Sequence, residues 1–124
     1  MIREARLDPT SLKWSNFLVA EVDAQLVGIA QMKPYVDCRE FGSFVVRREW
    51  RSQGVGQQLI KTLLAQEVGD VYLMCEQHML PYYRKFNFRQ IGFGAAPRTL
   101  KIKLVVTAPA RLFGIRMVCM KRIA

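Results

Sequence analysis

The sequence predicts an α/β fold whose sheet has strands of mixed direction, with a strand–helix–strand unit in its middle. Apolar, β-branched segments separated by turn residues fill the first part of the chain, as expected of strands. From Val55 onward, the apolar residues follow the 3.6-residue period of an amphipathic helix. The short, continuously apolar segment 70–75 comes next, and such a segment is typical of a strand covered on both faces.

The first elements are strands, and the turn residues between them set their limits. The tripeptide Asp-Ala-Gln at 23–25 interrupts an apolar run and predicts a tight turn. The strands on its two sides and the one that follows are predicted over 17–22, 26–32 and 41–46.

The predicted helix begins at Val55 and has Gly69 as its natural C-cap. Its buried stripe consists of Leu59, Ile60, Leu63 and Leu64. After strand 70–75, Pro81 near a helix start predicts a short helix over 80–86. The last two strands are predicted over 88–93 and 115–123.

The segment between these last strands admits two interpretations. Its residues Leu-Lys-Ile-Lys-Leu-Val-Val alternate as a strand would. Pro97 and Pro109, however, bracket about three helical turns, and this favours a helix with Leu100, Leu104 and Val105 on one face.

The length and charge of the chain set further limits. With 124 residues, we expect a single domain over 1–124. The net charge of +9 is uneven, because residues 77–124 contain ten Lys and Arg but no Asp or Glu. An acid-free segment indicates an anionic partner: the phosphates of a cofactor, nucleic acid, an acidic protein or a membrane surface.

The cysteines and the hydrophobic pattern point to a soluble protein of a reducing compartment. Cys38, Cys75 and Cys119 lie far apart, and the chain has a single histidine, so neither a disulfide framework nor a zinc site is expected. Cys75 and Cys119 lie in apolar runs, where buried inert thiols are expected. No uncharged stretch approaches the roughly 20 residues that span a bilayer. We therefore expect a cytoplasmic protein with no bound metal and no membrane partner.

The loop Arg-Arg-Glu-Trp-Arg-Ser-Gln-Gly-Val-Gly at 47–56 carries the clearest functional signal. It joins a predicted strand to the N-terminus of the predicted helix, where unbonded N–H groups and the helix dipole favour an anion. Gly54 and Gly56 would let a phosphate approach the backbone, and Arg51 adds a planar cation. The loop lacks the Lys-Ser/Thr pair of a Walker loop and the third glycine of a dinucleotide-binding fingerprint.

Two motifs resemble those of the GNAT acetyltransferase superfamily. Val46, Arg51, Gly54 and Gly56 fit its acetyl-CoA loop, V-x-P-x-x-[R/Q]-x-x-G-x-[G/A], with Arg48 in place of the proline. Tyr83, Lys85 and Phe88 fit its F-Y-x-K-x-G-F motif, with Asn87 in place of the glycine. Asn tolerates the positive φ that such a glycine supplies.

The resemblance implies a mixed, mostly antiparallel GNAT-like sheet and a role for named residues. Acetyl-CoA would be the cosubstrate, and the cofactor-binding residues would be Phe44, Val45, Val46, Arg51, Ser52, Gln53, Gly54, Val55, Gly56 and Gln57. A backbone N–H near Phe44–Val45 would stabilise the oxyanion, and Tyr83 would be the general acid that protonates the leaving thiolate. Glu40 is the first candidate for the general base and Asp37 the second, whereas His78 is expected to be a partly exposed residue at a helix start.

The N-terminal region departs from the family pattern. The chain begins almost at the family's second strand, so the first strand and the first two helices are expected to be short or absent. Residues 7–22 and 49–60 also look similar to a cyanobacterial and plastid group of these enzymes.

The function implied is transfer of an acetyl group from acetyl-CoA to a primary amine. Two alternatives stay open: a sensor that binds acetyl-CoA without turnover, and a basic nucleic-acid-binding module. No zinc spacing, RNP-like strand or helix–turn–helix pattern supports the second alternative. The acceptor could be a small amine, an arylalkylamine, an aminoglycoside or a protein amine, and a homodimer is compatible with a shortened edge.

Overall fold

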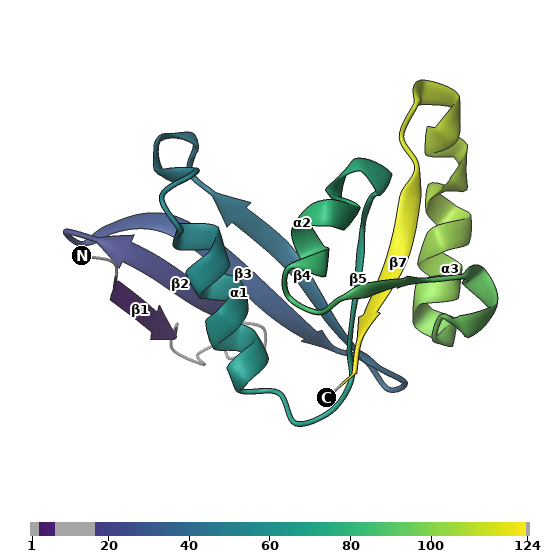
Figure 1. Ribbon diagram of the computed structural model, residues 1–124, viewed down its shortest axis with the longest axis horizontal. Coiled ribbons are helices and arrows are strands. Elements are labelled where there is room, and N and C mark those ends of the chain that lie inside the picture. Colours follow the sequence, from purple (N-terminus) through teal and green to yellow (C-terminus); the bar gives the residue numbers. More distant parts are fainter. Residues whose placement is uncertain (1–2, 7–16, 124) are drawn as a thin grey trace. The chain divides into compact units, whose positions relative to one another are not determined.

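The computed structural model describes residues 3–6 and 17–123 (Figure 1). Within these residues it contains seven strands and three α-helices, and the chain divides into two compact units. The first unit comprises Met1–Lys33 and Phe41–Glu67, and the second comprises Pro34–Glu40 and Val68–Ala124. Part of the stretch 7–22, on which the cyanobacterial and plastid resemblance rests, lies outside the described residues.

The strands of the first unit follow one another in the order β1-β2-β3-β4. Their bounds are Arg3–Arg6, Phe17–Val22, Gln25–Pro34 and Arg39–Val46. The pairs β1–β2 and β2–β3 are antiparallel. Asp23 and Ala24, with φ of 51° and 63°, form the two-residue turn between β2 and β3, as the sequence predicts. The strand β1 was not among the predicted strands; it has four residues and pairs with β2, which agrees with the expectation of a short or absent first strand.

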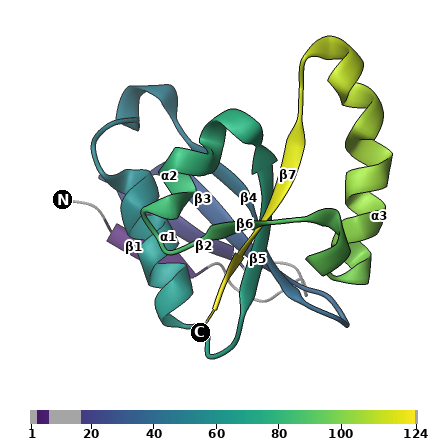
Figure 2. The ribbon, with the colours of Figure 1, turned by 45° about the vertical axis from the view of Figure 1, so that its right-hand side comes forward.

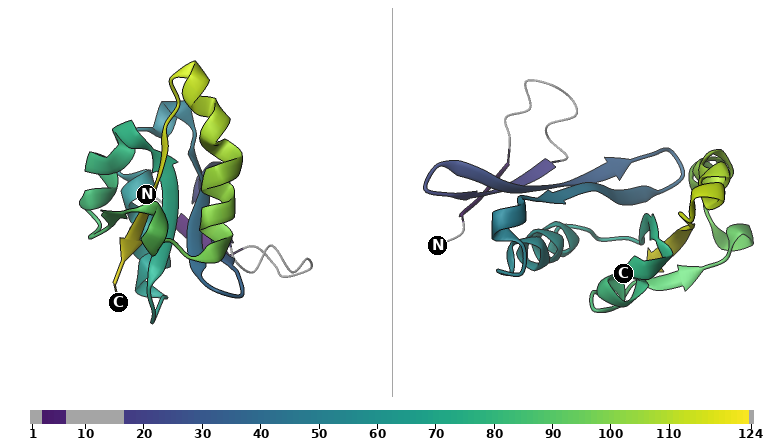
Figure 3. Two further views of the ribbon diagram at one scale, coloured as in Figure 1. Left: turned by 90° about the vertical axis from the view of Figure 1, so that its right-hand side faces the viewer. Right: turned by 90° about the horizontal axis from the view of Figure 1, so that it is seen from above.

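Helix α1, Val55–Ala65, packs against one face of the strands of the first unit (Figures 1 and 3). Its buried residues are Val55, Leu59, Ile60, Leu63 and Leu64, which confirms the predicted stripe. A Cβ at Gly28 on β3 would lie 3.0 Å from side-chain carbons of Leu59 and Val55, so glycine is needed for the helix to approach this closely. The helix ends at Ala65 and its C-cap is Gln66, so the prediction of Gly69 as the C-cap was wrong. The buried stripe ends at Leu64, and Val68 is exposed.

In the second unit the strand order is β5-β7-β6, with both pairs antiparallel. The elements are β5 (Val71–Glu76), α2 (Leu80–Arg84), β6 (Arg89–Ile91), α3 (Arg98–Thr107) and β7 (Met117–Arg122). The segment for which the sequence allowed either a strand or a helix thus forms the helix α3. A 3-10 helix, Ala108–Phe113, connects α3 to β7.

The helices α2 and α3 lie on opposite faces of β5 and β7 (Figures 2 and 3). Leu100 on α3 packs with Ala96 and with Cys119 on β7, and Leu104 is packed against this cluster. Val105, which we predicted on the same face, is 61% exposed, so this part of the prediction was wrong. The predicted α/β class with a mostly antiparallel sheet is confirmed.

Candidate functional site

The loop before α1 holds backbone conformations that suit a phosphate. Ser52 has φ of 67° and Gly54 has φ of 84°, so both lie in the left-handed region on either side of Gln53. The Nε of Arg51 donates a hydrogen bond to the carbonyl of Val46 at 3.1 Å, and the side-chain amide of Gln53 donates to the carbonyl of Glu49 at 3.0 Å. The first bond ties the loop to the end of β4, and the second closes the loop on itself.

The N-terminus of α1 is exposed and carries no negative charge of its own. Its N-cap is Gly54, no side chain caps it, and its first turn contains no acidic residue. Val55 is 1% exposed and belongs to the hydrophobic core, whereas Gln57 is exposed. The start of α1 therefore combines an uncapped end with the positive end of the helix dipole, an arrangement that suits an anion.

The end of β4 lies next to this loop in the chain. The N–H of Arg47 donates to the carbonyl of Val27 on β3 at 2.8 Å. Phe44 and Val46 are partly buried, whereas Val45 is 58% exposed. The first unit thus brings together all ten predicted cofactor-binding residues, from Phe44–Val46 to the first turn of α1.

Tyr83 lies on α2 in the second unit and is 8% exposed. Its ring meets that of Tyr82 edge to face at 5.2 Å between centroids and that of Phe88 at 6.2 Å. Burial, with smaller contributions from Cys75 and Tyr82, raises the pKa of Tyr83 above its ordinary value of 10.0. The phenol therefore stays protonated at neutral pH, as a general acid must.

The turn after α2 confirms the expectation for Asn87. This residue has φ of 69°, in the left-handed region where glycine and asparagine are favoured. The turn is closed by the N–H groups of Phe86 and Phe88, which donate to the carbonyl of Tyr83 at 3.0 and 3.4 Å. Asn87 therefore has the positive φ that the resemblance implied for this position.

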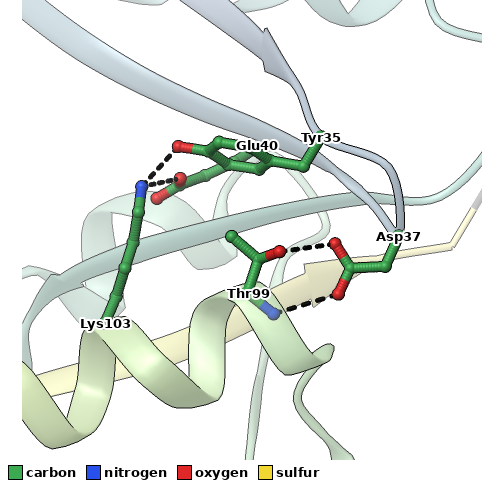
Figure 4. Close-up of polar contacts among 5 residues, drawn as sticks. All are labelled: Tyr35, Asp37, Glu40, Thr99 and Lys103. Carbon is green, nitrogen blue, oxygen red and sulfur yellow. Dashed lines mark hydrogen bonds and ion pairs between the residues drawn. The ribbon is translucent and has the colours of Figure 1, made fainter.

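Glu40, the candidate base, is 5% exposed and is held by a lysine that the sequence analysis did not single out. The Nζ of Lys103 lies 2.6 Å from a carboxylate oxygen of Glu40, and it donates at 2.5 Å to the hydroxyl of Tyr35 (Figure 4). Burial works to lower the pKa of Lys103, but the hydrogen bonds to Glu40 and Tyr35 outweigh it and raise that pKa. The carboxylate is thus already occupied by a cation.

Asp37, the second candidate base, is bound to the start of α3. Its carboxylate accepts hydrogen bonds from the backbone N–H of Thr99 at 3.0 Å and from its hydroxyl at 2.7 Å (Figure 4). These hydrogen bonds lower the pKa of Asp37. The contacts cap α3 from the β3–β4 turn, 62 residues away in sequence. His78 is exposed in a 3-10 helix before α2, as expected.

The cysteines form no disulfide, and two of them are buried as predicted. Cys75 and Cys119 are 7% and 1% exposed, and burial raises their pKa to about 11 and about 12. Within the described part of the chain, no group of three or more His, Cys, Asp and Glu residues could hold a metal ion. In that same part, no helix combines the length and apolar character that crossing a membrane requires.

Three solved structures illustrate the likeness of this fold to known proteins. N-acetylglutamate synthase from Neisseria gonorrhoeae, complexed with coenzyme A and N-acetyl-glutamate, matches with a TM-score of 0.67 and 19% identity over 90% of this chain and 26% of that chain. Rv2747 from Mycobacterium tuberculosis, in complex with CoA, matches with a TM-score of 0.70 and 14% identity over 91% and 78% of the two chains. Ard1 from Thermoplasma volcanium matches with a TM-score of 0.67 and 19% identity over 91% and 74%. The chain thus spans about a quarter of the length of the gonococcal synthase.

The sequence comparisons agree with the fold. No curated protein sequence matches the chain. The family model of the acetyltransferase (GNAT) domain matches residues 13–90, which include the loop before α1, the end of β4 and Tyr83. The match covers more than half of the 124 residues, and the chain therefore belongs to the GNAT acetyltransferase family.

Proposed function

We propose that the protein transfers an acetyl group from acetyl-CoA to a primary amine, and that both units together form one acetyltransferase domain over 1–124. The observation that carries the proposal is the start of α1, where left-handed Gly54 precedes an uncapped and acid-free helix N-terminus. Family membership supports acetyl-CoA as the source of the anion that this N-terminus would hold.

The loop would bind the pyrophosphate of the cofactor mainly through its backbone. The N–H groups from Gln53 to Gln57 would donate to phosphate oxygens, and Gly54 and Gly56 would keep Cβ atoms out of the way. Arg51 uses its Nε on the carbonyl of Val46, so the terminal nitrogens of its guanidinium are available for a phosphate. The backbone of Phe44–Val46 would hold the pantetheine arm.

In the reaction, the amine forms a C–N bond with the acetyl carbonyl carbon, and the C–S bond of the thioester breaks. A backbone N–H near Phe44–Val45 would stabilise the negative charge on the acetyl oxygen. Tyr83 would give its proton to the departing thiolate, and burial keeps its phenol in the protonated form that this step requires.

The pairing of Glu40 with Lys103 bears on the general base. For Glu40 to accept a proton from the acceptor amine, its carboxylate would have to exchange Lys103 for that amine. The same observation favours a second candidate function, in which the protein binds acetyl-CoA as a sensor without turnover.

A transfer assay separates these functions. Purified protein is mixed with acetyl-CoA and a panel of primary amines, and the free thiol of coenzyme A is measured. The transferase releases coenzyme A only when a suitable amine is present. The sensor binds acetyl-CoA in a calorimetric titration but releases none with any amine, and absence of binding would overturn both functions.

A further inference from the structure

The second unit contains a cavity of about 420 Å³ that the proposed cofactor site does not use. Its walls come from the second half of α3, the 3-10 helix that follows, and the strands β6 and β7. Cavities of this volume take small organic molecules. Gln77, which lines the cavity, follows β5 directly. The cavity adjoins α3, whereas Tyr83 lies on α2, which covers the opposite face of β5 and β7.

Two arginines give the cavity its positive charge. Arg111 and Arg116 line it, and among its described lining residues none is Asp or Glu. Neither arginine forms an ion pair with any described residue. The carboxylates of Asp37 and Glu40 in the same unit are bound to Thr99 and Lys103. Arg111 and Arg116 are both exposed residues, and their guanidinium groups have the fork geometry that pairs with a carboxylate or phosphate.

The remaining walls combine apolar side chains with the amide side chains of Gln77 and Gln90. Ile91, Leu104, Met117 and Val118 line the cavity together with Phe93, which is 54% exposed. The hydroxyl of Thr107, also in the wall, already donates to carbonyls of its own helix. The lining therefore offers a ligand two cations, two amide side chains and several apolar side chains.

We propose that this cavity binds a small organic anion, a carboxylate or phosphate monoester carried on an apolar body. The anionic group lies between Arg111 and Arg116, and the apolar body lies against Ile91, Leu104 and Phe93. Two sources would supply this chemistry: an acceptor amine that also bears the anion, or an effector that does not react.

The test uses two probes of equal shape, 3-phenylpropionate and its neutral amide, in calorimetric titrations. The acid is expected to bind about tenfold or more tightly than the amide, because charge-assisted hydrogen bonds to arginine are lost with the amide. The double variant Arg111→Gln/Arg116→Gln is expected to remove this preference. The control is Arg84→Gln/Arg98→Gln, which removes the same charge at two exposed residues outside the cavity. Equal binding of acid and amide, or an equal loss in the control, would overturn the proposal.

The source is identified by a second pair, phenylalanine and phenylalaninamide, in the transfer assay. If the anion belongs to the acceptor, phenylalanine is acetylated, and the double variant raises its KM but not that of phenylalaninamide. If it belongs to an effector, 3-phenylpropionate changes the rate of benzylamine acetylation and is not consumed. Only the assignment of the anion to an acceptor or to an effector rests on the proposed function. The titrations need no turnover, so a failure of anion binding can be distinguished from a failure of acetyl transfer.

Discussion

The ammonium group of Lys103 on α3 lies 2.6 Å from the carboxylate of Glu40 at the start of β4. The two residues differ in their access to water, because the side chain of Glu40 is 6% exposed and that of Lys103 is 34% exposed. Together with the contact between Asp37 and Thr99, this pair ties α3 to the β3–β4 turn within the second unit.

Removing either partner of this pair is expected to have unequal effects. Lys103→Met leaves the buried carboxylate without a cation and should lower the free energy of unfolding by about 2–4 kcal/mol. Glu40→Gln should lower the free energy of unfolding by a smaller amount, because the partly exposed lysine can turn toward water. Chemical denaturation of both variants measures the difference. An equal or reversed order would contradict the structural role of the pair.

The contribution of Asp37 to stability is expected to depend on pH. Its pKa is lowered in the folded state by hydrogen bonds from Thr99, so its stabilisation is present above its ordinary value of 3.8 and is lost as the pH falls through the folded value. Asp37→Ala should therefore melt at a lower temperature than the wild type at pH 7, and the two melting temperatures should converge below pH 4. A constant difference across this range would show that the carboxylate charge is not involved.

Asn87 provides a test of backbone conformation in the second motif. Because its φ is 69° and its side chain is exposed, Asn87→Gly should leave stability nearly unchanged. Asn87→Val should cost about 1–2 kcal/mol, since a β-branched residue disfavours this region. Thermal unfolding of the two variants measures the difference in stability. Equal stabilities would contradict a left-handed backbone conformation at Asn87.

Tyr83→Phe tests the proposed general acid. The ring stays in its packing, so acetyl-CoA affinity should be unchanged while kcat falls by about 100-fold or more. Tyr82→Phe is the matched control on the same helix and should keep its turnover. Because the pKa of Tyr83 is raised, the wild-type rate should not decline near pH 10, the ordinary value for tyrosine. A decline that starts there, or unchanged turnover in Tyr83→Phe, would argue against the assignment.

The fold was predictable wherever a segment carries its own hydrophobic pattern. The stripe from Val55 to Leu64 gave the start and buried face of α1, and the turn residues gave the β2–β3 hairpin. The strand Arg3–Arg6 has no such pattern, because its residues are mostly charged and backbone pairing with β2 forms it. For α3, the strand-like alternation is overridden by the packing of Leu100 and by the cap from Asp37.

The site was predictable only where motifs are contiguous. The positive φ of Gly54 and of Asn87 follow from the residue types at these positions. The engagement of Glu40 by Lys103 was not predictable, because the partners are 63 residues apart and neither carries a local signal. The same holds for Arg111 and Arg116, which are exposed residues of the basic segment and line a cavity together with residues of β6, β7 and α3.

The central claim is that the start of α1 binds acetyl-CoA through its backbone, and Gly54 tests it most directly. Gly54→Val introduces a Cβ where φ is 84°, whereas Gly69→Val places one at a residue outside the left-handed region with no atom within 4 Å. In calorimetric titrations with acetyl-CoA, we expect Gly69→Val to bind like the wild type and Gly54→Val to bind at least about tenfold more weakly. Equal affinity of the two variants, or no binding by the wild type, would contradict the claim.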